Sequence, residues 1–197
     1  MPAVGYDDGK QNPQGGRLLE YHRDLGGFLA GIEKRAFRMT ELAVGNKDDA
    51  LDILQDAMCG LVERYGMRPP EEWGPLFRTI LHSRIQDWRR RESVRRRFRI
   101  WFTHSGNEED SDPVQQVADD QRPGPERDLS NRRSMHALGR ALRNLPLRQQ
   151  QAFMLRVFEG LDVDDTAEIM RCTAGSVKTH FSRAVYYLRQ ELGEHWP

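Results

Sequence analysis

The chain has 197 residues, of which 38% are hydrophobic, and its 30 basic and 30 acidic side chains give a formal net charge of zero. This length accommodates one domain or two small ones, and the hydrophobic content suits helical units with modest cores. The only cysteines, Cys59 and Cys172, lie far apart and have no metal-ligand spacing to any of the six histidines, which argues against a disulfide scaffold and a zinc finger.

The N-terminal part of the chain predicts a tail followed by a helix. Residues 1–17 are rich in Gly, Asn, Gln and Asp and offer little to bury, so we expect a disordered tail. Apolar residues then recur at steps of three and four over residues 18–37, which predicts an amphipathic helix.

A second helix is expected over residues 47–65, and its outer face is acidic. The face carries five residues: Asp48, Asp49, Asp52, Gln55 and Asp56. Like charges four residues apart repel each other by a few tenths of a kcal/mol per pair, a cost that a basic partner would offset. A solvated face is the alternative, and it accounts better for the two carboxylates in the first turn than for Asp52 and Asp56.

A third helix is predicted from about Pro75 to Arg97, after a loop that includes residues 71–74. Between positions 76 and 99 the chain has nine arginines against only Asp87 and Glu92, interleaved with aromatic residues. Guanidinium groups suit phosphates, and flat rings suit unstacked bases, so this helix favours contact with single-stranded or melting DNA. The alternative is a helix that is basic for solubility, but so many like charges repel each other when no polyanion is near.

Residues 103–131 are expected to form a flexible acidic linker. From residue 104 to residue 128 there are eight carboxylates against Arg122 and Arg127, together with Asp112-Pro113 and Pro123-Gly124-Pro125, and no sustained periodicity. The zero net charge of the chain therefore conceals a basic block followed by an acidic one.

The C-terminal part reads as a helix-turn-helix. Helical spacing resumes at Arg132–Asn144, a further helical run opens at Leu145-Pro146, and a short helix over Asp162–Met170 precedes a turn at residues 171–173. Thr173 is placed to cap the last helix. That helix buries one stripe (Val177, Phe181, Ala184, Val185 and Leu188) and turns another outward (Ser176, Lys178, Thr179, His180 and Arg183). A major groove would accept the outward stripe, with Lys178 and Arg183 as the main electrostatic contacts. Any three-helix domain with a polar outer face is the alternative.

Taken together, these motifs resemble the extracytoplasmic-function (ECF) group of sigma factors of bacterial RNA polymerase. The match rests on Asp48–Asp56, on Phe77–Arg90 and on the run from Leu145-Pro146 through Ala184, in that order along the chain. The resemblance implies an all-α fold of two small helical domains joined by the flexible acidic linker. Residues 18–102 would be the region 2 helical bundle and residues 132–197 the region 4 helix-turn-helix.

The resemblance also implies roles for individual residues. Polymerase binding would fall to Asp48, Asp49, Asp52, Gln55 and Asp56. Recognition and melting of the minus-10 element would fall to Trp73, Arg78, Ser83, Arg84, Trp88, Arg91 and Arg95. Reading of the minus-35 element would fall to Arg156, Ser176, Lys178, Thr179, His180 and Arg183.

The implied function is promoter-specific initiation of transcription, without chemistry of its own. The partners would be core RNA polymerase, through its β′ clamp and β subunits, and promoter DNA, with an anti-sigma factor as a further candidate. We expect no cofactor, no metal and no enzymatic activity, because the sequence has no paired ligand motif, nucleophile elbow or phosphate loop. With no signal segment and no apolar run of about 18 residues, we expect a cytoplasmic protein without a membrane span. Two rivals are a free-standing helix-turn-helix transcriptional regulator, against which the N-terminal helices argue, and a nuclease.

Overall fold

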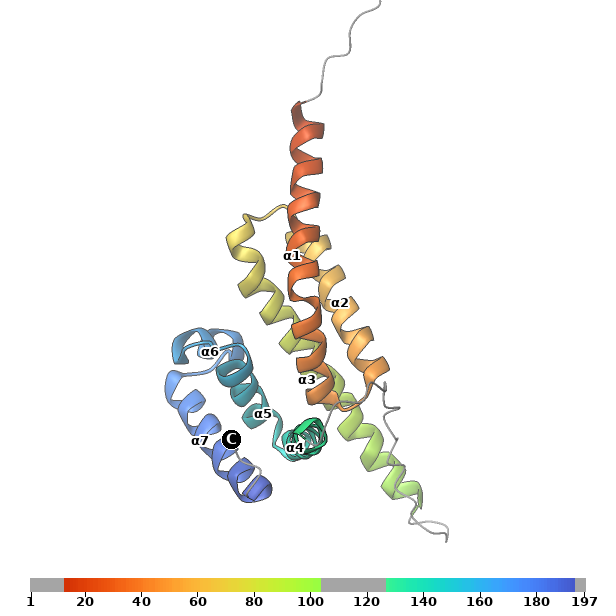
Figure 1. The fold of residues 1–197 in the computed structure, drawn as a ribbon, viewed down its shortest axis with the longest axis vertical. Coiled ribbons are helices and arrows are strands. Elements are labelled where there is room, and N and C mark those ends of the chain that lie inside the picture. Colours follow the sequence, from red (N-terminus) through yellow and green to blue (C-terminus); the bar gives the residue numbers. More distant parts are fainter. Residues whose placement is uncertain (1–12, 104–126, 194–197) are drawn as a thin grey trace, which may run out of the picture.

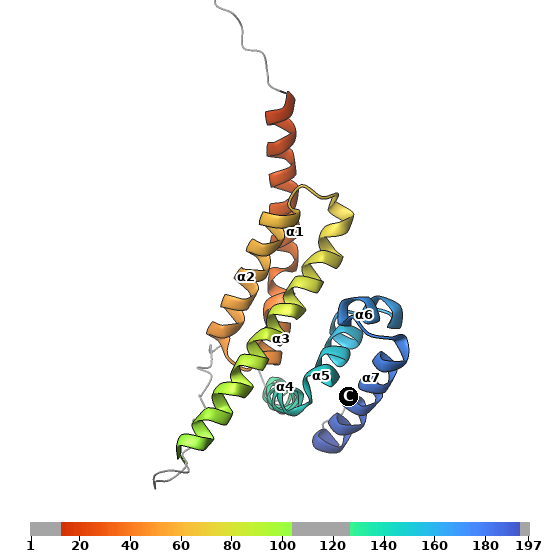
Figure 2. The ribbon, with the colours of Figure 1, turned by 180° about the vertical axis from the view of Figure 1, so that it is seen from behind.

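The computed structural model describes residues 13–103 and 127–193, and every regular element in those ranges is helical. The helices form two units that lie side by side (Figures 1 and 2). Helices α1 to α3 make the N-terminal unit, and the later helices make the C-terminal unit. Among the residues described, no helix is both long enough and apolar enough to cross a membrane.

The N-terminal unit is a bundle of three long helices, α1 (Pro13–Val44), α2 (Lys47–Tyr65) and α3 (Pro70–Thr103). Their apolar faces meet in a core that includes Met39, Leu54, Leu61, Phe77 and Leu81. The turn from α1 to α2 needs a left-handed residue, which Gly45 supplies with a φ of +82°. Asn46 then caps α2, because its side-chain oxygen accepts hydrogen bonds from the backbone N–H groups of Asp48 and Asp49.

Helix α2 has the bounds predicted from the sequence, but the other two helices are longer than expected. Helix α1 begins at Pro13, so the prediction of a disordered tail through residue 17 is wrong for its last five positions; residues 1–12 lie outside the described part. Helix α3 begins at Pro70, so the predicted loop over residues 71–74 is also wrong. Proline is tolerated in a first helical turn, and Glu71 and Glu72 there interact favourably with the positive end of the helix dipole.

The predicted linker is shortened at both ends. Helix α3 includes Thr103, and α4 (Arg127–Asn144) begins five residues before the expected start at Arg132. Residues 104–126, which hold most of the linker carboxylates, lie outside the described residues.

The C-terminal unit continues from α4 into α5 (Leu147–Phe153), a π-helical turn η1 (Met154–Phe158), α6 (Val163–Met170) and α7 (Ala174–Leu192). Two apolar clusters hold it together. One joins α4, α5 and α7 through residues such as Leu142, Phe153 and Leu188. The other joins η1, α6 and α7 through residues such as Leu155, Met170 and Val177.

The two units are in direct contact along α1 and α3. The side-chain amide of Gln150 in α5 donates a hydrogen bond to the carbonyl oxygen of Ala43 in α1, at 3.1 Å. One helical turn further on, Met154 is buried in the core of the N-terminal unit. Beyond it, Arg35 in α1 donates a hydrogen bond to the carbonyl oxygen of Phe158. Helix α5 and η1 therefore contact the N-terminal bundle at Gln150, Met154 and Phe158.

Candidate nucleic-acid interface

The helix-turn-helix is formed by α6 and α7, and its turn is fixed by backbone geometry and a cap. Arg171 ends α6 in the left-handed conformation with a φ of 50°. Thr173 then caps α7, because its hydroxyl oxygen accepts a hydrogen bond from the N–H of Ser176 at 3.2 Å. The sequence predicted this cap, and the structure confirms it.

Helix α7 divides into a buried and an exposed face along the predicted stripes. Val177, Ala184 and Leu188 are fully buried, and Phe181 and Val185 pack beside them. On the other side Lys178, Thr179 and Arg183 are exposed, whereas Ser176 and His180 are half-buried. Donors and cations thus follow the outer face of the second helix, the geometry that a helix-turn-helix presents to a major groove.

Tyr186 is an outward residue of α7 that sequence reasoning missed. Tyr186 is 70% exposed, more than any other large hydrophobic residue among those described. It follows Ser182 by four positions and Lys178 by eight, so it shares their helix face. This spacing could have identified it from the sequence.

Arg156 lies on η1 and is held by the C-terminal unit itself. Its guanidinium group donates a hydrogen bond to the carbonyl oxygen of Leu161 and lies over the ring of Phe181, 5.9 Å from the ring centroid. Since Phe181 belongs to α7, these contacts fix the cation close to the recognition helix.

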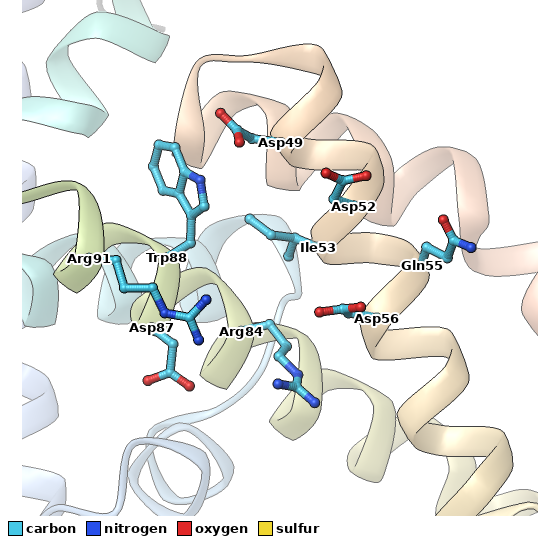
Figure 3. A pocket seen from close by; sticks show the side chains of 9 residues that line it. All are labelled: Asp49, Asp52, Ile53, Gln55, Asp56, Arg84, Asp87, Trp88 and Arg91. Atoms are coloured by element: carbon cyan, nitrogen blue, oxygen red, sulfur yellow. The ribbon is translucent and has the colours of Figure 1, made fainter. Parts of the chain in front are cut away.

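In the N-terminal unit, the acidic face of α2 and the basic face of α3 form the two walls of one groove of about 430 Å³ (Figure 3). Asp49, Asp52, Gln55 and Asp56 line the α2 wall. The α3 wall carries Arg84, Asp87, Trp88 and Arg91. Within the described residues no ion pair closer than 4.0 Å joins the walls, so both rows of charge remain available to partners.

The seven residues assigned to the minus-10 element differ in accessibility. Ser83, Arg91 and Arg95 are exposed, and Arg78, Arg84 and Trp88 are half-buried. Trp73 is only 2% exposed, and its ring packs against Phe28, with 5.9 Å between centroids. The structure therefore places Trp73 in the core and not on the groove, and its contact with DNA stays a prediction. Because α3 begins at Pro70, Trp73 falls on the inner face of that helix, in the core.

The C-terminal unit matches a known protein family in sequence. Residues 135–188 match the family model described as sigma-70, region 4. The C-terminal unit is a sigma-70 region 4 domain. Its match extends from α4 to the buried Leu188 of α7 and so includes α6, the turn and most of α7.

The region 4 domain and the helices before it together have the fold of a sigma factor. A solved structure of the sigma factor RpoE from Bartonella quintana, in complex with the anti-sigma factor NepR, matches with a TM-score of 0.53. The match covers 88% of this chain and 96% of that one, at 23% sequence identity, so the likeness is one of fold. No curated protein sequence matches the chain. The expected all-helical sigma-factor fold is confirmed.

The described residues form no candidate metal site. No group of three or more His, Cys, Asp or Glu side chains in this part of the chain is arranged to hold a metal ion. The buried histidine, His82, is instead a neutral core residue, since burial and the nearby Arg78 lower its pKa to about 4.

Proposed function

We propose that this protein is an ECF-group sigma factor that binds core RNA polymerase and directs promoter-specific initiation of transcription. The observation that carries the proposal is the region 4 match at residues 135–188, preceded by a three-helix unit in a chain with a sigma-factor fold. The protein has no catalytic role of its own in this function, which consists of binding and positioning.

The region 4 domain is proposed to read the minus-35 element with the outer face of α7. Lys178 and Arg183 would contact phosphates, which position a protein on the duplex, and Ser176, Thr179 and His180 would meet base edges near the start of the helix. Arg156, held against Phe181, would add a cation at the same surface.

The N-terminal unit is proposed to be region 2, in which the two walls of the groove serve different partners. The carboxylates of α2 would bind a basic surface of the polymerase β′ clamp. The arginines and Trp88 of α3 would bind the minus-10 element as its strands separate. Because the walls face each other, the sigma factor would hold melted DNA next to the polymerase clamp.

Neither unit is expected to bind its promoter element tightly alone. Phosphate contacts dominate such affinity and are screened by salt, and polymerase would hold both units at a fixed separation, raising the effective concentration of each. In the solved relative, the sigma factor is bound to an anti-sigma factor. We propose a partner of that class here as well.

The proposal is tested by co-elution of the full chain with bacterial core RNA polymerase, followed by transcription from a promoter library. The variant Asp52→Lys/Asp56→Lys should abolish co-elution, because two repulsive charges replace two attractive ones on α2. Asp24→Lys/Glu33→Lys is the matched control, since it changes the charge equally at exposed positions of α1. Tight binding of the unmodified chain to duplex DNA without polymerase, and no co-elution, would favour the free-standing regulator instead.

A further inference from the structure

Tyr186 lies in the middle of the outer face of α7, between the two cations that are proposed to contact DNA. With about 3.6 residues per turn, Tyr186 is about 80° around the helix axis from Lys178 and about 60° from Arg183, in opposite directions. It also lies about 12 Å further along the helix than Lys178. At 70% exposed, it is left largely uncovered by the described chain. A large aromatic side chain with a polar end therefore projects from this surface.

The two hydroxyl groups that flank Tyr186 on this face donate their protons within the helix. Thr179 donates to the carbonyl oxygen of Gly175 at 3.0 Å, and Ser182 donates to the carbonyl oxygen of Lys178 at 2.9 Å. Such bonds to the residue four positions earlier leave a hydroxyl with only its lone pairs for a ligand. The hydroxyl of Tyr186 has no hydrogen-bond partner within the described part of the chain. Of these three hydroxyl groups, only that of Tyr186 is therefore free to donate to a ligand.

The surroundings of Tyr186 favour an anionic ligand that accepts hydrogen bonds. A phosphate oxygen accepts but does not donate, so a free phenol suits it, and Lys178 and Arg183 on either side add positive charge. Long side chains on a helix lean toward its N-terminus, so the hydroxyl of Tyr186 lies over the turn that carries Arg183. Among the residues of α7, Tyr186 is the only exposed large hydrophobic one, so it belongs to no apolar patch of the kind that marks a protein partner.

We propose that Tyr186 is a further DNA-contact residue of region 4, whose hydroxyl donates a hydrogen bond to a backbone phosphate at the edge of the major groove. The choice of DNA as the ligand rests on the proposed function. Phosphate contacts fix the orientation of a protein on the duplex, and a contact about 12 Å beyond Lys178 hinders α7 from tilting in the groove. Because the phenol is uncharged, it neutralises no phosphate and releases no counterion. Tyr186 therefore orients α7 through a contact that salt screens little.

The contact is tested by titrating a short duplex of random sequence with the full chain, at several low salt concentrations. Phosphate contacts do not depend on sequence, so the measurement requires neither a known promoter nor polymerase. Tyr186→Phe keeps the ring and removes the hydroxyl. It should lower the affinity about three- to ten-fold, as expected for one hydrogen bond, and leave the slope of affinity against salt unchanged.

Tyr187→Phe is the matched control, because it removes the same group from the next position, which is half-buried against the core of the C-terminal unit. This variant should bind the duplex as the unmodified chain does. Equal losses of affinity in Tyr186→Phe and Tyr187→Phe would overturn the proposal.

Lys178→Ala separates this proposal from the proposed function. It should lower the affinity and also lower the slope against salt by about one, since it removes a charged phosphate contact. If Lys178→Ala weakens binding and Tyr186→Phe does not, the contact of Tyr186 is overturned and the DNA role of α7 stands. If neither variant changes binding, α7 does not contact the duplex, and the role of α7 in the proposed function fails together with this proposal.

Two further variants identify which part of Tyr186 acts. Tyr186→Ala should lose about as much affinity as Tyr186→Phe. Tyr186→Arg should restore the affinity and raise the slope against salt by about one, because a guanidinium group donates to the same phosphate and also neutralises it. A loss in Tyr186→Ala without a loss in Tyr186→Phe would overturn the proposal, since the ring and not the hydroxyl would then make the contact.

Discussion

Gln150 donates its side-chain amide to the carbonyl oxygen of Ala43 at 3.1 Å, a buried hydrogen bond between residues 107 positions apart. The bond joins the region 4 domain to the end of α1. At this position α1 gives way to Gly45, beside which lies the side chain of Arg143: a Cβ at Gly45 would lie 2.6 Å from Arg143 Nε. The contact between the units thus depends on a buried hydrogen bond and on the close approach of the Arg143 side chain to the backbone of Gly45.

Replacing Gln150 with leucine should show how much this hydrogen bond between the units contributes to the free energy of unfolding. Gln150→Leu keeps the size of the side chain but leaves the Ala43 carbonyl oxygen without its donor, which should lower the free energy of unfolding by about 1–3 kcal/mol. Urea denaturation measures the change. Gln190→Leu, at an exposed position of α7, should leave stability within about 0.5 kcal/mol of the unmodified chain.

His82 should make stability depend on pH. Its pKa in the folded chain is about 4, below the value of 6.5 expected when unfolded, so protons bind the unfolded state first as the pH falls. The contribution of His82 to the free energy of unfolding is therefore constant above pH 6.5. Up to about 3 kcal/mol of it is lost as the pH falls from 6.5 to 4. His82→Gln does not titrate, and its unfolding free energy should fall less over that range. Identical pH profiles for the two proteins would refute the assignment of a neutral, buried imidazole.

Trp73 and Trp88 should behave in opposite ways. Trp73→Ala removes a buried ring that packs on Phe28 and should destabilise the chain by about 3–5 kcal/mol. Trp88→Ala, at a half-buried position on the groove, should destabilise less and should weaken binding to single-stranded DNA, since each stacked base contributes about 1–3 kcal/mol. Urea denaturation and oligonucleotide titration of both variants give the comparison. A larger loss of DNA affinity in a still-folded Trp73 variant would return Trp73 to the binding surface.

Lys178 and Arg183 should control the salt dependence of region 4 binding to duplex DNA. Lys178→Ala and Arg183→Ala should each weaken binding across sequences and lower the slope of affinity against salt by about one. Arg140→Ala, exposed on α4, removes a charge away from α7 and serves as the control. The measurement is a titration of a minus-35 duplex, in the presence of polymerase, at several salt concentrations.

Thr173 should contribute to the stability of the helix-turn-helix through its cap on α7. Thr173→Ala removes the acceptor for the N–H of Ser176 and should lower the free energy of unfolding by about 1 kcal/mol. Thr173→Asp should retain the cap, because its carboxylate accepts the same bond and interacts favourably with the helix dipole. If both variants lost the same stability in thermal unfolding, the cap would not be the cause.

The sequence by itself determined the helical class, the bounds of α2, the cap at Thr173 and the two faces of α7. Each of these follows from information local to one helix: a period of apolar residues, an Asn or Thr before a first turn, and a left-handed turn residue. The acidic row on α2 and the basic row on α3 were visible for the same reason.

The tertiary structure decided which tryptophans and arginines are buried and which groups they contact. Trp73 looks like a base-stacking ring in the sequence, but the start of α3 at Pro70 turns it into the core, and local preference did not foresee a helix through Pro75. The sequence does not distinguish Arg89 from the other arginines between positions 76 and 99. Only the structure shows that Arg89 donates hydrogen bonds to the end of α4. The contact between Arg89 and the end of α4 could not be predicted, because it joins residues more than fifty positions apart. Such contacts are set by how the two cores pack, and no periodicity within a single helix records them.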